Sequence, residues 1–341
     1  MPPVSLRYTD MHMAGEPVRI VTSGYPELTG ATILDKRREA RERHDHLRRA
    51  MMWEPRGHAG MYGVIPVKPS HADAALGVLF THHEGYSTMC GHATIALGRW
   101  IVDQGLVAKT EPLTRFAIEA PCGLLKLSCR IENGEIVDVA FESVAAFVEA
   151  RDLTIEVAGF GAITTDIVYG GAYYAILPAS RFGLDFYATP LEKLVDAAGA
   201  LTDALRARRP LQHPEAPDLA FYYGTIVTDE ATADQPSGNL CIFAERQIDR
   251  SPTGSGVTAR MALDHAKGLI ATGVRRTFRG VSGEPMAGRV VGAANDGRPG
   301  AVTVEVAGQG FYAGSGEFLI EPQDRLGLGF ELPRRFPSRT A

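Results

Sequence analysis

The sequence predicts a mixed α/β protein built as two similar lobes. Three observations support this fold class. The chain has 341 residues, a length that suits about two domains. Short segments rich in Val, Ile, Leu and Phe recur along it, bounded by Gly, Pro or Asn, and this pattern is typical of strands. Twice, a glycine-rich loop leads into a short helix of small and apolar residues, and a helix that is apolar on every side is buried.

The first half of the chain opens with strand-like segments separated by Gly and Pro. A helical stretch is predicted from about 31 to 52, followed by a Gly/Pro-rich loop over 54–60. The buried helix of this half is predicted for 93–102, where Ala, Ile, Leu and Trp occupy nearly every side. Strands are predicted at 18–21, 63–67, 75–81, 113–119, 123–129 and 136–142.

The second half repeats this plan. Its buried helix is predicted for 257–269, and a surface helix for 191–208. We expect a linker near 149–154. One lobe would then comprise 1–150 with about 316–341 and carry Cys90, and the other would comprise 151–315 and carry Asp249 and Thr253. Further strands are predicted at 165–168, 172–177, 221–227, 239–244, 289–291, 301–306 and 316–320, and around Phe278.

Composition narrows the classes of function. The 35 Lys and Arg against 40 Asp and Glu give a net charge of −5, so no basic field favours nucleic acid. No run of about 18 apolar residues predicts a membrane span. The N-terminus lacks the pattern of a secretory signal, and none of the four cysteines forms a Cys-x-x-Cys pair. We therefore expect a cytoplasmic protein with reduced thiols.

Both glycine-rich loops place a small polar residue at the start of a predicted buried helix. Such a start presents unpaired N–H groups and the positive end of the helix dipole, which suits a carboxylate or phosphate. It also lowers the pKa of a cysteine, so Cys90 is a candidate reactive thiolate. The alternative is a buried structural cysteine, a common role for this residue type.

Cofactor and metal motifs are weak. Gly254-x-Gly256-x-x-Ala259 matches part of a dinucleotide fingerprint but lacks the acidic residue expected about 20 positions later. No P-loop or G-x-S-x-G motif occurs. The clusters at 82–84 (HHE) and 44–46 (HDH) lack metal-ligand spacing, because neighbouring residues point to different sides of a helix or strand. We expect neither a cofactor nor a metal.

Two longer segments carry a resemblance. Residues 84–92 (EGYSTMCGH) and 249–256 (DRSPTGSG) resemble the paired active-site motifs of the proline racemase superfamily. Supporting segments are 11–20 (MHMAGEPVRI), 54–58 (EPRGH), 170–174 (GGAYY) and 237–240 (SGNL). The resemblance implies a diaminopimelate epimerase-like fold, in which two pseudo-symmetric lobes each wrap strands around a central helix. It also implies cofactor-independent chemistry at the Cα of an amino acid bound between the lobes.

One position departs from the racemases of this family, which carry a cysteine in both motifs. Here the second motif has Thr253, whose hydroxyl is too weak an acid to exchange protons as a thiol does. Cys90 can still remove the Cα proton, but the carbanion then needs another outlet. A hydroxyl on C3 of a proline ring provides it by leaving as water. The Cys/Thr pair thus predicts dehydration of trans-3-hydroxy-L-proline to Δ1-pyrroline-2-carboxylate.

The remaining roles follow from the matched motifs. The backbone N–H groups around Gly91, His92, Gly254 and Ser255 would hold the substrate carboxylate, and Asp249 would accept hydrogen bonds from the ring ammonium. His92 would hydrogen-bond the substrate or help the hydroxyl to leave. Thr253 would hydrogen-bond the 3-hydroxyl or a water. The structural alternative for Asp249, His92 and Ser255 is a turn or cap role.

Two other functions stay open. One is a 4-hydroxyproline epimerase or proline racemase, in which Thr253 and a water still reprotonate Cα. The other is a non-catalytic binder of proline-like ligands. The expected partner is a small hydroxyproline, with no nucleic acid or membrane, and a homodimer is expected because C2 symmetry is the commonest.

Overall fold

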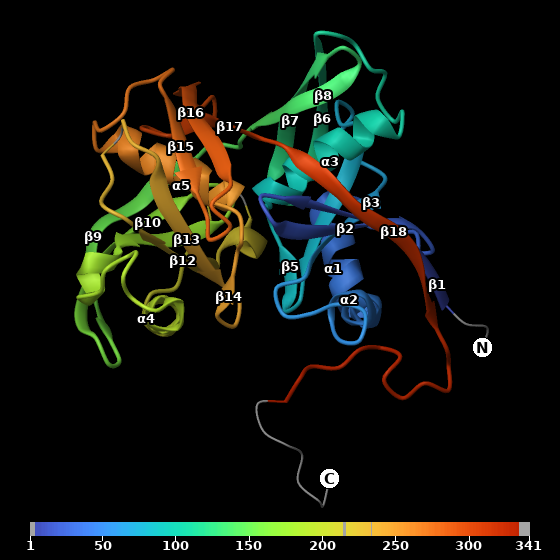
Figure 1. Ribbon diagram of the computed structural model, residues 1–341, viewed down its shortest axis with the longest axis horizontal. Helices are drawn as coiled ribbons and strands as arrows, with labels where there is room; N and C mark the ends of the chain where they lie inside the picture. Colours follow the sequence, from blue (N-terminus) through green and yellow to red (C-terminus); the bar gives the residue numbers. More distant parts are fainter. Residues whose placement is uncertain (1–3, 214–215, 233, 334–341) are drawn as a thin grey trace, which may run out of the picture.

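The computed structural model describes residues 4–213, 216–232 and 234–333. Figure 1 shows a mixed α/β architecture with two halves side by side, each containing one central helix among strands. The first half holds β1 (Val4–Met13), β2 (Glu16–Ser23), α1 (Ile33–Arg43), α2 (Asp45–Met52), β3 (Tyr62–Val67), β4 (Leu76–His82), β5 (Gly85–Ser87), α3 (Gly91–Asp103), β6 (Leu113–Ala120), β7 (Gly123–Glu132) and β8 (Glu135–Glu142).

The second half is built in the same way. It holds β9 (Phe147–Val157), β10 (Gly161–Tyr169), β11 (Tyr173–Pro178), α4 (Leu191–Arg208), β12 (Tyr222–Thr228), β13 (Ser237–Phe243), β14 (Gln247–Ile248), α5 (Gly254–Ala266), β15 (Arg275–Arg279), β16 (Pro285–Ala293) and β17 (Val302–Gly308). The last strand, β18 (Gly310–Ile320), lies against β1 of the first half (Figure 1). Short 3-10 turns cover Ala179–Phe182 and Pro217–Leu219.

Helix α3 is the centre of the first half. Its apolar residues are buried, and it packs on β1, β2, β7, β8 and β18. Gly98 allows β8 to pack closely, because a Cβ there would lie 2.7 Å from a methyl group of Val139 on β8. The predicted buried helix is therefore confirmed.

Helix α5 has the same place in the second half, where it packs on β9, β10, β16 and β17. A Cβ on Gly288 of β16 would lie 2.7 Å from the Met261 side chain of this helix. Helix α4 lies over β9, β12 and β13 and shields their second face. The sequence placed α5 three residues too far along the chain, since the helix begins at Gly254 and ends at Ala266.

The two halves are joined by strand pairing. β8 runs antiparallel to β17, with Phe141 opposite Val306. β18 pairs with β1 from Met13 opposite Gly310 to Val4 opposite Ile320. The chain thus crosses between the halves at 143–146 and again at 308–310. These pairings favour lobe boundaries there, and the division itself stays a prediction.

Three local expectations are wrong. The single helix at 31–52 is two helices, because His44 (φ −125°, ψ 12°) leaves the helical conformation between them. The linker at 149–154 lies instead within β9, where Thr154 pairs with Thr164. Between its buried ends this strand has half-buried and exposed residues, and its polar face made it resemble a linker. The last strand begins at Gly310 rather than 316, because the small residues after Phe311 continue the ladder to β1.

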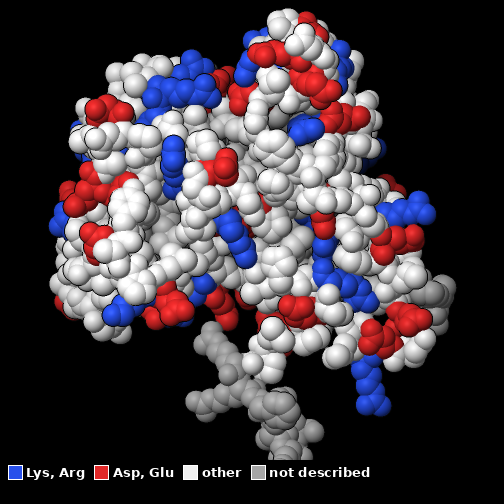
Figure 2. All heavy atoms as spheres, viewed as in Figure 1, with Lys and Arg blue, Asp and Glu red and all other residues white. Residues whose placement is uncertain are grey.

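Charge is distributed without one dominant sign on the face shown in Figure 2, where acidic and basic side chains are interspersed. No helix of the described residues is long and apolar enough to cross a membrane. The four cysteines are free and buried.

Candidate active site

The two predicted loops meet where the N-termini of α3 and α5 abut. Cys90 is the N-cap residue of α3 and Thr253 that of α5. A Cβ added to Gly91 would lie 2.3 Å from Cα of Gly254, and one added to Gly254 would lie 2.6 Å from Cα of Gly91. Only glycine at both positions permits this approach. The structure therefore brings the N–H groups of both helix starts to one place, as an anion site requires.

Cys90 sits at this junction with its side chain buried. Its Sγ accepts a hydrogen bond from the Ala93 N–H at 3.4 Å and lies 3.3 Å from Nδ1 of His92. Burial raises the pKa of the thiol well above its usual value, and the negative charge of Asp249 adds to this, while the Ala93 N–H opposes it. The expected lowering of this pKa is wrong for the closed site, because loss of hydration outweighs the helix N-terminus.

Thr253 is held by a compact loop centred on Asp249. Oδ1 of Asp249 accepts hydrogen bonds from the N–H and the hydroxyl of Ser251, at 2.8 and 2.7 Å. Oδ2 accepts the Thr253 hydroxyl at 2.7 Å. The backbone of Thr253 has φ +63°, which is rare for a β-branched residue. The Asp249 contacts fix this conformation and turn the Thr253 hydroxyl away from a helix-capping role.

His92 lies between the two loops. Its Nδ1 is 3.8 Å from Oδ2 of Asp249, and its ring packs edge-on against Tyr62 with centroids 4.8 Å apart. Burial lowers the pKa of His92, although the nearby Asp249 opposes this. His92 is therefore a neutral imidazole at pH 7, able to donate one hydrogen bond and accept another.

Ser255, in the first turn of α5, contacts Tyr174 of β11. Their hydroxyls are 2.6 Å apart, so Tyr174 fixes the Ser255 rotamer. The turn before Tyr174 also touches the first loop, because the Thr88 hydroxyl donates to the Gly171 carbonyl at 2.9 Å. Tyr174 lies in one of the supporting segments of the family resemblance, and the structure joins it to a predicted substrate-binding residue.

Two buried residues next to the site were not singled out from the sequence. Glu16 is 0 % exposed, and its Oε2 accepts the Arg250 backbone N–H at 2.7 Å. The Cys241 thiol hydrogen-bonds with Thr253, and burial raises its pKa. Glu16 lies inside one of the supporting segments of the family resemblance, so that signal was available. Cys241 carries no local signal, because only the fold places β13 behind Thr253.

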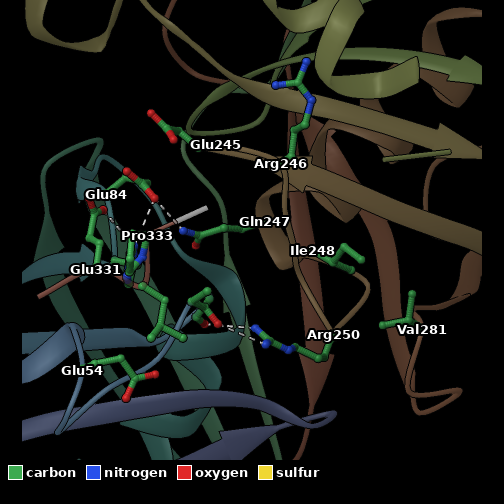
Figure 3. Close-up of a pocket in the computed structure, with 14 residues that line it drawn as sticks. Glu54, Glu84, Glu245, Arg246, Gln247, Ile248, Arg250, Val281, Glu331 and Pro333 are labelled. Carbon is green, nitrogen blue, oxygen red and sulfur yellow. Dashed lines mark hydrogen bonds and ion pairs between the residues drawn. The ribbon is translucent and has the colours of Figure 1, made fainter. Parts of the chain in front are cut away.

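The site is closed to solvent. Its residues are each at most 4 % exposed. Side-chain contacts at its outer side bridge the halves: Gln247 Nε2 donates to Glu84 at 2.8 Å, and Arg250 Nη1 donates to the Gly60 carbonyl at 3.0 Å. Outside these contacts lies a cavity of about 790 Å³, lined from both halves (Figure 3). Because Cys90 is buried, a substrate can reach it only after the site opens.

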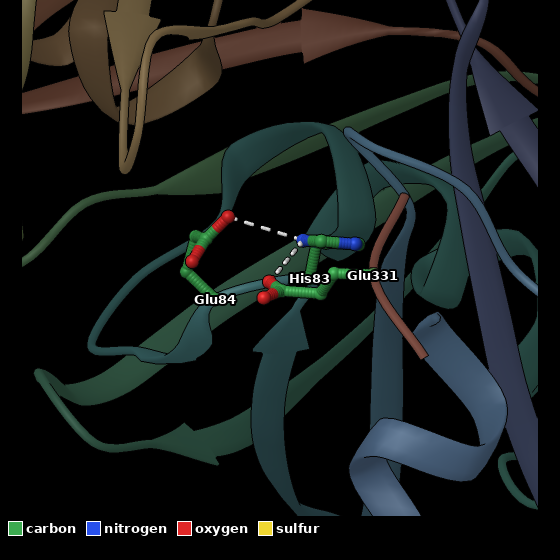
Figure 4. A group of neighbouring side chains, drawn as sticks. All are labelled: His83, Glu84 and Glu331. Atoms are coloured by element: carbon green, nitrogen blue, oxygen red, sulfur yellow. Dashed lines mark hydrogen bonds and ion pairs between the residues drawn. The ribbon is translucent and has the colours of Figure 1, made fainter. Parts of the chain in front are cut away.

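One group of possible metal ligands comes together in the described ranges. His83, Glu84 and Glu331 place their ligand atoms within 4.8 Å of one another at the rim of the cavity (Figure 4). Nδ1 of His83 is 3.1 Å from Glu84 and 3.8 Å from Glu331. Direct pairing of the imidazole with Glu84 accounts for this arrangement. The expectation that the chain holds no metal stays a prediction.

Comparisons with known proteins agree with this geometry. A sequence model described as proline racemase matches residues 8–331. The chain is 50% identical over 331 residues to a trans-L-3-hydroxyproline dehydratase of Xenopus tropicalis, covering 96% of this chain and 95% of that protein. It is 49% identical over 334 residues to a human trans-3-hydroxy-L-proline dehydratase, covering 96% and 94%.

A solved structure shows the same fold over almost the whole length. It is a hydroxyproline epimerase from Agrobacterium vitis with bound trans-4-hydroxy-L-proline. The TM-score is 0.91 at 25% sequence identity, covering 97% of this chain and 96% of that one. The two halves and their central helices are thus an arrangement found in an amino-acid epimerase.

Proposed function

The chain belongs to the proline racemase family, and we propose that it is a trans-3-hydroxy-L-proline dehydratase, a hydro-lyase that needs no cofactor. The observation that carries this proposal is the pair formed by Cys90 and Thr253 at two abutting helix N-termini. One side of the junction offers a thiol, and the other a hydroxyl that donates to a carboxylate. The dehydratases named above support the same reading.

The proposed chemistry uses one base. The Cys90 thiolate takes the Cα proton, so the Cα–H bond breaks and an S–H bond forms. The electron pair forms a double bond between Cα and C3, and the C3–O bond breaks. The hydroxide leaves as water with one proton; in the net balance this is the proton taken from Cα, so the Cys90 thiolate is restored, and the enamine tautomerises to Δ1-pyrroline-2-carboxylate. A 4-hydroxyl cannot leave in this way, because it is one carbon further from the carbanion.

Substrate binding uses both helix starts. The N–H groups around Gly91, His92, Gly254 and Ser255 would hold the carboxylate, and their dipoles would stabilise the charge that develops as the proton leaves. Asp249 would accept one N–H of the ring ammonium. Thr253, oriented by Asp249, would hydrogen-bond the 3-hydroxyl, and neutral His92 would donate to the substrate. Closure of the halves would exclude water and strengthen these contacts.

The direct test is product formation. Purified protein without added cofactor is incubated with trans-3-hydroxy-L-proline, and the appearance of Δ1-pyrroline-2-carboxylate is followed. We expect turnover of this compound and no pyrroline product from trans-4-hydroxy-L-proline. Binding of trans-3-hydroxy-L-proline without any turnover would instead favour a non-catalytic binder. A cytoplasmic location and a homodimer stay predictions.

The pH dependence of dehydration should follow the ionisation of the buried Cys90 thiol. Only the thiolate of Cys90 removes a proton, and burial raises the pKa of this group. Activity should therefore fall as the pH falls below that pKa. We expect kcat/KM for dehydration to rise about tenfold per pH unit through neutrality and to level off only above about 8.5, the ordinary thiol value. A profile that is flat from about pH 6 to 9 would exclude Cys90 as the base.

Thr253→Cys should give the protein racemase or epimerase activity that it otherwise lacks. A thiol at this position places a second group of suitable acidity on the opposite face of Cα. We expect the variant to invert L-proline or trans-4-hydroxy-L-proline at Cα, while the unchanged protein does not. Chiral chromatography of each substrate measures this. If the unchanged protein inverts them at a comparable rate, the epimerase alternative replaces the dehydratase.

A further inference from the structure

Glu16 is a buried carboxyl group with one oxygen unused. It is the first residue of β2, in the first half, and its side chain is 0 % exposed. Oε2 accepts the backbone N–H of Arg250 from the second half at 2.7 Å and lies 3.5 Å from Nη1 of the same residue. Oε1 is buried and has no hydrogen-bond partner among the described residues. Such an oxygen is costly unless a ligand satisfies it.

The contacts of its neighbours place this carboxyl group beside the site. Arg250, which Glu16 binds, directly follows Asp249 in the loop that orders Thr253. The backbone carbonyl of Pro17, the residue after Glu16, accepts a hydrogen bond from the His92 ring. A negative charge on Glu16 also raises the pKa of the Cys90 thiol. Glu16 is therefore buried close enough to Cys90 and Asp249 for their charges to affect one another.

The charges around Glu16 favour a cationic ligand. Burial raises the pKa of Glu16 well above its usual value, and the charge of Asp249 raises it further, against the opposing effect of Arg250. Glu16 thus has one partly exposed guanidinium, that of Arg250, to balance its charge, while Asp249 repels it. A cationic ligand placed between them would relieve the repulsion and favour ionisation of Glu16.

The number of acceptor positions left on Asp249 also favours a second acceptor for a cationic ligand. A carboxylate has about four acceptor positions, and Asp249 already accepts two bonds from Ser251 and one from Thr253. It has room for one more. The secondary ammonium of a proline ring carries two N–H donors, so Asp249 alone leaves one of them unpaired in a dry site.

We propose that Oε1 of Glu16 accepts the second N–H of the substrate's ring ammonium. Asp249 and Glu16 together would then select ring acids with a cationic nitrogen. The cross-half bond from Arg250 to Oε2 holds Glu16 in place, so this recognition forms only in the closed site. The inference rests on the proposed function for the class of ligand, but it concerns binding and not dehydration.

The test compares two ligands that differ at the ring nitrogen. Dissociation constants of L-proline and of tetrahydro-2-furoate, in which an ether oxygen replaces the ammonium, are measured by calorimetry with the full chain and with Glu16→Gln. The glutamine carbonyl can still accept the Arg250 N–H, but its amide turns donors toward the ammonium. We expect L-proline to bind roughly 10- to 100-fold more weakly, the usual effect of a lost bond to a charged group. Binding of tetrahydro-2-furoate should be nearly unchanged.

Glu84→Gln is the matched control. Glu84 also bridges the halves, through Gln247, but it lines the outer cavity. This variant should keep the preference for L-proline. Equal weakening of both ligands in Glu16→Gln, or none, would show that Glu16 is only structural and would overturn the proposal. So would an unchanged protein without preference for L-proline.

Loss of folding and failure of the proposed function can each be distinguished from failure of this inference. If Glu16→Gln does not fold, as judged by circular dichroism, Glu16→Asp replaces it. The shorter side chain withdraws the carboxylate from the ammonium and should lower the preference for L-proline, and a full preference would overturn the proposal. If the unchanged protein prefers L-proline but dehydrates no hydroxyproline, the proposed function fails while this inference stands.

Discussion

Replacing Cys90 with serine should lower kcat for dehydration by about 10²- to 10⁴-fold, the usual contribution of a positioned general base. The serine hydroxyl is too weak an acid to form the base at neutral pH, whereas the thiol can ionise. The fold should persist, because serine is no larger than cysteine and can still accept the Ala93 N–H that Sγ accepts. Steady-state rates with trans-3-hydroxy-L-proline, together with a thermal melt, measure both effects.

Cys129→Ser is the control for this variant. Cys129 is also fully buried, and its thiol donates to the Gly98 carbonyl in the core of the first half. It should keep the activity of the unchanged protein, with some loss of stability. Activity within a few-fold of normal in Cys90→Ser would show that another group removes the proton.

Gly91→Ala should abolish most activity without changing the Cys90 thiol itself. The added methyl carbon would lie 2.3 Å from Cα of Gly254, which is backbone and cannot move aside alone. The starts of α3 and α5 would be pushed apart. The shared anion site would then open, and a displacement of about 1 Å at a reacting centre can cost roughly 100-fold in rate. We expect kcat/KM to fall by at least about that factor.

Gly85→Ala provides the comparison within the same segment. A Cβ at Gly85 meets nothing within 4 Å, so this variant should retain activity. Far-UV circular dichroism of Gly91→Ala should remain that of the folded protein, since the clash is confined to the junction of the two helix starts. Normal activity of Gly91→Ala would mean that catalysis does not need the two helix starts in contact.

Much of the fold could be predicted from the sequence because its signals are local. The surface helix at 191–208 has the predicted limits, and the buried helix α3 follows from apolar residues on every side. β9 was missed because a strand with one exposed face has polar residues at alternate positions. The residues at 310–315 were missed for a different reason. Their ladder partner, β1, is at the other end of the chain.

The residues of the candidate site could be predicted from the sequence, but their pKa values could not. Motif resemblance singled out Cys90, Asp249 and Thr253, and the structure places them at one junction. The pKa of Cys90 could not be predicted, because the depth of burial in the closed site decides it. The free oxygen of Glu16 is likewise a tertiary property, since its one partner comes from the other half.

The most direct test of the central claim is proton NMR of trans-3-hydroxy-L-proline with the purified protein in D2O. A single base on one face of Cα, with loss of the 3-hydroxyl, predicts conversion to Δ1-pyrroline-2-carboxylate and no accumulation of the Cα-inverted, deuterated epimer. It also predicts that L-proline and trans-4-hydroxy-L-proline are not inverted. Accumulation of an inverted epimer from any of the three would contradict the one-base account and show that the Thr253 side delivers protons as well.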